Sequence, residues 1–135
     1  MKTVSKLFKN YNKKTVFIIH EHYADKAGLH YDLRIQKEDI LKSWSTRKLP
    51  DLANGTLNKI QLFPTEDHSL DWENFEGNIE HGYGKGKVYI WDKGFCIIEK
   101  WDKNITIIFE GKKLKGKYTF IPYIKNTFLL IKHKI

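Results

Sequence analysis

Three side chains capable of metal and phosphate chemistry, His30, Asp32 and Arg34, follow one another at spacings of two residues. Residues 29–36 alternate apolar and polar side chains, so a β-strand would place these three on one face and pack Leu29 and the other apolar residues on the opposite face. Neighbouring members of the ladder would lie about 7 Å apart. An imidazole and a carboxylate can bind a divalent cation, and a fixed guanidinium can bind a phosphate beside it. The spacing therefore predicts metal-assisted phosphate chemistry.

A second histidine, His22, comes just before the loop 23–28 that leads into His30. Two strands joined by such a loop are expected to be neighbours, so His22, His30 and Asp32 could meet at one ion. Two imidazoles and a carboxylate suit borderline metals such as Mn, Fe or Zn. The alternative for either histidine alone is a capped or exposed ring.

Two further polar residues are candidates for the same pocket. His68 lies in the acidic run 66–71, where neighbouring carboxylates can fix its tautomer and raise its basicity. It could contact the scissile phosphate or act as a general acid, but taken alone the pattern favours a loop histidine in a solvated acidic run. Lys48 would add positive charge to this pocket, against the alternative of an ordinary basic surface. Tyr83, between two glycines, either lines a groove or packs in a turn.

The composition indicates a basic protein with an ordinary core. Lys and Arg number 24 against 16 Asp and Glu, which gives a net charge of +8. This charge fits a polyphosphate partner, most often nucleic acid, or a basic domain that binds no polyanion. The lone Cys96 cannot form a disulfide within the chain and is expected to be a packed small hydrophobe, in agreement with a reducing compartment. With no apolar stretch long enough for a membrane span or signal segment, we expect a soluble, intracellular monomer in the cytoplasm or nucleoid.

The pattern of the chain predicts an all-β fold, a compact antiparallel barrel with long loops and at most short helices. Short runs rich in β-branched and aromatic residues are separated by turn signals at 91–94, 102–104 and 110–112, and the last five runs recur at a spacing close to ten residues. The predicted strands are 15–21, 29–36, 39–46, 59–63, 87–91, 95–101, 104–110, 115–121 and 126–132. Residues 1–14 are expected to form a basic arm and residues 15–135 a single domain. Helical turns are possible at 4–11 and 50–54, and 49–58 and 64–86 are expected to be irregular.

Several motifs together resemble one family, the 3′-phosphoesterase domain of bacterial DNA ligase D. They lie at residues 17–24, 29–34, 41–44, 66–71, 75–77, 82–86 with 88, 91–94, 114–116 and 130–132. The resemblance covers nearly everything from residue 17 to the end, in order and with similar gaps. It implies a β-barrel with a manganese-dependent active site in a groove. It also implies removal of a terminal ribonucleoside from a DNA primer strand to leave a 3′-phosphate, and then removal of that phosphate.

The resemblance also assigns roles to residues. It implies that His22, His30 and Asp32 bind Mn²⁺, with Co²⁺ or Zn²⁺ as possible substitutes, and that Arg34 and His68 contact the phosphate. Lys48 matches a position that supports activity. The implied partners are DNA 3′ ends, as in a primer–template, and a DNA ligase supplied in trans.

The sequence departs from the family pattern at four places. The loop between His22 and His30 is two residues longer, which should bulge without moving the ligands. Trp72 replaces an expected tyrosine, Ile60 replaces an expected arginine, and most of an N-terminal arm is missing. Because that arm matters most for ribonucleoside removal in the family, phosphate removal is expected to survive better than ribonucleoside removal.

Three other interpretations stay open at this point. Charge and aromatic content alone also fit a non-catalytic nucleic-acid-binding β-barrel. A degenerate family member could recruit a ligase without turnover. A His-x-Asp motif with a distant histidine is also a pattern of non-haem iron oxygenases, although the match far outside this motif argues against that assignment.

Overall fold

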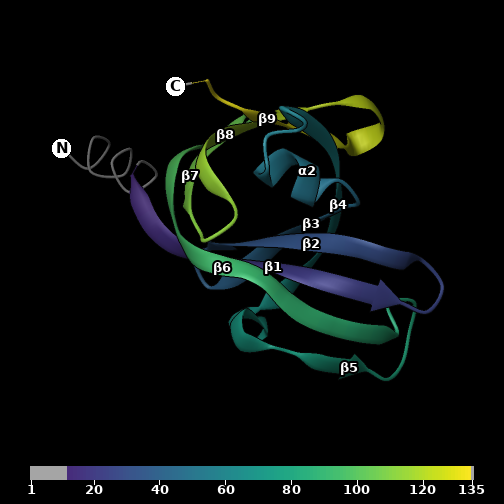
Figure 1. Ribbon diagram of the computed structural model, residues 1–135. Coiled ribbons are helices and arrows are strands. Elements are labelled where there is room, and N and C mark those ends of the chain that lie inside the picture. Colours follow the sequence, from purple (N-terminus) through teal and green to yellow (C-terminus); the bar gives the residue numbers. More distant parts are fainter. Residues whose placement is uncertain (1–11, 135) are drawn as a thin grey trace.

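Within residues 12–134, eight antiparallel strands close into a barrel, which confirms the antiparallel barrel that the sequence predicted. The computed structural model describes residues 12–134. Its elements are β1 (Lys13–Ala24), β2 (Gly28–Lys37), β3 (Ile40–Thr46), α2 (Leu49–Ala53), β4 (Lys59–Ser69), the 3-10 helix η1 (Leu70–Asn74), β5 (Gly77–Ile79), β6 (Gly86–Trp101), β7 (Ile105–Glu110), β8 (Lys115–Pro122), the 3-10 helix η2 (Ile124–Asn126) and β9 (Phe128–Lys132). The strand order around the barrel is β1-β2-β3-β4-β9-β8-β7-β6, and pairing of β6 with β1 closes it (Figure 1). The short β5 is added to the outer edge of β6.

The barrel interior is filled by apolar side chains that point inward from alternate positions along each barrel strand. On β1, for example, Phe17 and Ile19 are fully buried in the core, where the Phe17 ring meets Phe109 of β7 edge to face. The short helix α2 adds Leu49 and Leu52 to this core, at the place where the sequence predicted a helical turn. No helix in residues 12–134 is long and apolar enough to cross a membrane.

The turn expected at residues 91–94 does not exist, because β6 runs through it as one long strand. Trp91 is an extra residue between Ile90 and Asp92, which pair with consecutive residues of β1, so the strand bulges there. The buried carboxylate of Asp92 accepts hydrogen bonds from the backbone N–H groups of 112, 113 and 114, in the loop that links β7 to β8. A Cβ on Gly94 would lie 2.5 Å from the carbonyl oxygen of Glu110. Asp92 therefore binds the β7–β8 loop, and Gly94 allows the backbone of β7 to approach closely; neither residue forms a turn.

The segment expected to be irregular after residue 63 is also ordered in part. β4 continues to Ser69, pairing with β9 up to Leu62 and with β3 from Phe63 onward. Pro64 is tolerated because β4 has only one partner strand at that position. η1 and β5 follow, and the irregular stretch shrinks to short connections.

Two other boundaries differ from expectation. β1 begins at Lys13, so the last residues assigned to the basic arm belong to the barrel. The rest of that arm, with the helical turn expected at 4–11, lies outside the described residues. Leu29 was expected to pack but is 40% exposed, because it pairs with the exposed Tyr23 beside the loop that joins β1 to β2.

Candidate functional site

Neighbouring strands β1 and β2 bring the predicted metal ligands together on the outward face of the barrel. His22 pairs directly with His30, and His20 pairs with Asp32. Because residues opposite each other in an antiparallel pair point to the same side, alternation on both strands turns these side chains away from the core. The longer loop between His22 and His30 does not disturb this register, as expected.

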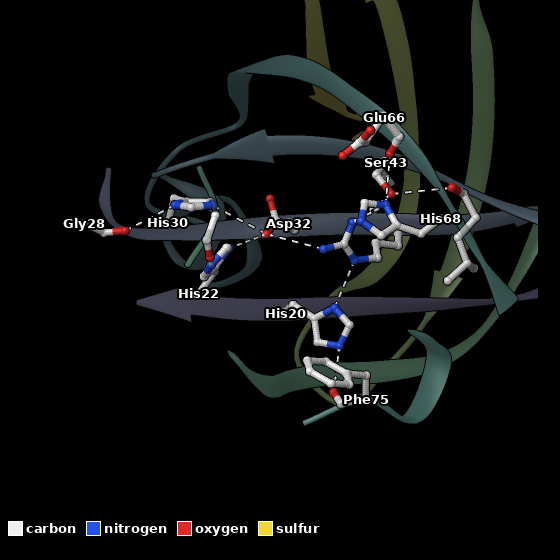
Figure 2. A network of polar contacts seen from close by, with 12 residues as sticks. His20, His22, Gly28, His30, Asp32, Ser43, Glu66, His68 and Phe75 are labelled. Carbon is white, nitrogen blue, oxygen red and sulfur yellow. Dashed lines mark hydrogen bonds and ion pairs between the residues drawn. The ribbon is translucent and has the colours of Figure 1, made fainter. Parts of the chain in front are cut away.

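His22, His30 and Asp32 form a compact cluster of possible ligand atoms. The Asp32 Oδ2 atom lies 3.2 Å from His22 Nδ1 and 3.4 Å from His30 Nε2, and one ligand atom from each residue lies within 4.8 Å of the others. Figure 2 shows both imidazole rings turned toward Asp32. This donor set fits a borderline divalent metal.

The remaining ring nitrogens of the two histidines face backbone carbonyls. His22 Nε2 lies 2.6 Å from the Gly84 oxygen, and His30 Nδ1 lies 3.2 Å from the Gly28 oxygen. Such bonds fix the ring orientation of metal-binding histidines in proteins. Gly84 also lies against the His22 ring, since a Cβ there would be 3.3 Å from Cε1. The glycine-rich loop between β5 and β6 therefore positions His22.

The electrostatics of the cluster keep its one carboxylate, Asp32, ionised. Burial alone would raise the pKa of Asp32, but hydrogen bonds with His22 and His30 and the charge of Arg34 outweigh it and hold that pKa well below its usual range. The hydrogen bond with Asp32 raises the pKa of His22 despite its burial. Asp32 is therefore ionised at neutral pH, and a cation bound at His22 Nδ1 would replace the proton there.

Arg34, two residues after Asp32, is a buried guanidinium with several fixed partners. Its side chain is 4% exposed and lies 3.5 Å from Asp32 Oδ2. Nη1 donates to Ser43 Oγ at 3.0 Å and lies 3.1 Å from His68 Nδ1, while Nε donates to His20 Nδ1 at 3.0 Å. Burial lowers the pKa of Arg34, although a guanidinium stays charged in proteins. These contacts hold one positive charge beside the cluster of His22, His30 and Asp32.

His68 comes from β4 rather than from a loop, and it reaches the same site. Its Nδ1 lies near both Arg34 Nη1 and, at 3.0 Å, the carbonyl oxygen of Glu66. Burial and then the charge of Arg34 lower the pKa of His68, so the ring is neutral at pH 7. When Nδ1 accepts from Arg34, Nε2 carries the hydrogen and can donate to an anion.

Trp72, on η1, packs over the phosphate-contact candidates. Its ring lies 5.3 Å from Arg34 Cζ, within cation–π range. It also meets the His68 ring edge to face at a centroid distance of 4.6 Å. The tryptophan thus supplies an apolar wall where the resemblance predicted a tyrosine hydroxyl.

All six predicted site residues line one cavity of about 810 Å³. They are His22, His30, Asp32, Arg34, Lys48 and His68. Lys48 is exposed at the start of α2. Tyr83 also lines this cavity and is 78% exposed, which favours the groove position over packing in a turn. Ile60 lines it as well, although it is 5% exposed.

The sequence reasoning missed His20, which is completely buried under the site. It accepts the Arg34 Nε hydrogen bond at Nδ1, and its Nε2 donates to the Phe75 carbonyl oxygen at 3.0 Å. Burial and then the charge of Arg34 lower its pKa to about 4. The available signal was its spacing of two residues from His22, which places both rings on one strand face.

The barrel and the site together define a β-barrel protein with a candidate phosphoester-processing site on its outer face. The chain belongs to the DNA ligase D 3′-phosphoesterase domain family, whose model matches residues 20–122. This confirms the resemblance drawn from the motifs and argues against the oxygenase interpretation.

Longer bacterial proteins share this segment. The chain is 38% identical over 112 residues to the "Multifunctional non-homologous end joining protein LigD" of Mycobacterium bovis, and the match covers 78% of this chain and 14% of the relative. It is 36% identical over 106 residues to the protein of the same description from Pseudomonas aeruginosa, with 72% of this chain and 12% of the relative covered. The chain thus spans only a small part of the length of these relatives.

Proposed function

We propose that this protein is a metal-dependent phosphoesterase that processes DNA 3′ ends in repair. The observation that carries the proposal is the His22–His30–Asp32 cluster with the fixed Arg34 guanidinium at its edge. Family membership and the name of the relatives, which refers to non-homologous end joining, support the DNA 3′-end substrate.

Each residue of the site would have a distinct role in this reaction. His22, His30 and Asp32 would hold Mn²⁺ or a similar divalent ion, which supplies Lewis-acid polarisation of a phosphate when bound. Arg34 neutralises a phosphate oxygen, and its fixed position means that little reorganisation is needed as charge develops. His68 donates a hydrogen bond or a proton from Nε2. The excess of basic residues holds the DNA backbone without reading its sequence.

The testing experiment is release of phosphate from a 3′-phosphate-terminated primer–template with added Mn²⁺. We expect turnover that stops in excess EDTA and returns when Mn²⁺ is restored. His30→Ala should lower both turnover and Mn²⁺ affinity by at least roughly 100-fold, since it removes one of three ligands. His133→Ala is the matched control, because this exposed histidine contacts Thr119 and lies outside the cavity.

Two results would contradict the proposal. Turnover that persists in EDTA would exclude the metal role. DNA binding that is unchanged in His30→Ala, with no phosphate release from the wild type, would favour a non-catalytic binding barrel or a ligase-recruiting family member instead.

A further inference from the structure

An exposed phenylalanine stands in the cavity that contains the polar site. Phe63 on β4 is 50% exposed, whereas Ile60 and Leu62 of the same strand are 5% and 0% exposed. The strand alternation thus turns Phe63 outward. Isolated exposed apolar residues are common on proteins, but this ring lines the same cavity as Asp32 and Arg34. Its location beside these polar residues, more than its exposure, indicates that the ring contacts a bound ligand.

The strand register places Phe63 in line with the metal-ligand cluster. Asp32 of β2 pairs with Ser45 of β3, and Ser45 pairs with Phe63 of β4. Directly opposed residues share a sheet face, so the three side chains form one row across three strands. Adjacent strands lie about 4.8 Å apart, which puts Phe63 about 10 Å from Asp32. One nucleotide covers such a span from its phosphate to the far edge of its base.

The surroundings of Phe63 suit a nucleotide better than an apolar ligand. Lys48, exposed two residues after β3 ends, lines the same cavity, and Arg34 and His68 offer the anion contacts described above. A flat apolar ring next to cationic and hydrogen-bonding groups is the arrangement that binds single-stranded nucleic acid, in which bases stack on aromatic rings while cations hold the backbone.

We propose that Phe63 is the stacking platform for the base at the 3′ end of the strand whose phosphate is bound by Arg34 and His68. This inference rests on the proposed function and adds a feature of the substrate. A base can stack on Phe63 only when it is free of its partner in the duplex, so the protein selects frayed, mismatched or single-stranded 3′ ends. Stacking has no base preference, because every base presents a π face.

The test is a binding cycle that needs no turnover. Two oligonucleotides with a 3′-phosphate are compared by fluorescence anisotropy without added metal, one with a normal terminal base and one with a tetrahydrofuran abasic residue there. Phe63→Ala should weaken binding of the first roughly 5- to 150-fold, the contribution of one base–aromatic stack, and leave binding of the second unchanged. Phe63→Tyr should retain the wild-type affinity, and Phe63→Leu should lose most of it.

Phe95→Ala is the matched control. Phe95 is 52% exposed on β6, its ring faces Lys14, and it does not line the cavity. This variant should bind both oligonucleotides like the wild type. The wild type should also bind a mismatched 3′ end more tightly than a paired one, and Phe63→Ala should abolish that difference.

Three outcomes would overturn the proposal. One is an equal loss on both oligonucleotides in Phe63→Ala, and another is no loss on either. The third is a base-dependent loss in Tyr83→Ala with none in Phe63→Ala, which would place the stacked base on the loop between β5 and β6. Because the cycle measures affinity alone, it stays informative even if the phosphoesterase assay shows no turnover.

Discussion

The Arg34 Nε–H group donates a hydrogen bond to His20 Nδ1 across the β1–β2 pair, at 3.0 Å. The other nitrogen of His20 donates to the Phe75 carbonyl oxygen, so the ring is the neutral Nε2–H tautomer. Its low pKa, about 4, agrees with this assignment, since burial and the charge of Arg34 both oppose protonation. We therefore expect His20 to act as a positioning residue that orients the guanidinium without taking part in the chemistry.

Replacement of His20 tests this positioning role. His20→Leu should lower kcat/KM for phosphate release roughly 10- to 100-fold, because a hydrogen bond to a charged group contributes about 1.5–3 kcal/mol. His20→Gln should recover most of that loss, since an amide can accept from Arg34 and donate to Phe75. Equal kcat/KM values for the two variants would show that the hydrogen bonds of His20 are not needed and that only its side-chain volume matters. Mn²⁺ affinity, measured separately, should change little in either variant.

The buried carboxylate of Asp92 should matter for stability and not for chemistry. Asp92→Ala leaves three loop N–H groups without their acceptor, and each buried unpaired group costs about 1–3 kcal/mol. We expect the free energy of unfolding to fall by about 3 kcal/mol or more, measured from the urea midpoint. Asp102→Ala, which removes an exposed turn carboxylate, should change it by less than about 1 kcal/mol. A similar loss in both would contradict the assignment of Asp92.

Cys96 should resist alkylation in the folded protein. It is completely buried, and burial raises its pKa to about 11, above the unfolded value of about 8.5. Because its folded pKa is raised, the neutral thiol favours the native state below about pH 8.5, and this contribution is lost as the pH rises toward 11. Iodoacetamide at pH 8.5 should therefore label Cys96 only in urea-unfolded protein. Rapid labelling under native conditions would place the thiol at the surface.

Sequence alone could predict the grouping of His22, His30 and Asp32 because two local rules sufficed. Strand alternation puts His30, Asp32 and Arg34 on one face, and a short connection makes the strand of His22 its neighbour. The barrel followed from the recurrence of short apolar runs. His68 was placed near the site only through the family resemblance. Pro64 suggested that the strand ended before it, whereas β4 continues through this proline to Ser69 and carries His68.

The features that sequence reasoning missed depend on long-range contacts. Asp92 and Gly94 look like a turn signal, but their chemistry is used by a loop about twenty residues away. His20 looks like any strand histidine until the Arg34 guanidinium is placed across from it. Phe63 could be recognised as exposed and next to the site only after the pairing of β3 with β4 was known.

Trp72 should bias the protein toward phosphate removal over ribonucleoside removal. Its indole ring lies against Arg34 and His68 and offers no hydroxyl there. The wild type, assayed on matched primer–templates, should therefore process a 3′-phosphate faster than a 3′-terminal ribonucleoside. Trp72→Tyr restores the hydroxyl and should narrow that ratio, whereas Trp72→Phe, which has no hydroxyl, should leave it as in the wild type. Equal wild-type rates on the two substrates would contradict this prediction. The same ratio of the two rates in Trp72→Tyr and Trp72→Phe would show that the hydroxyl at this position does not set the preference.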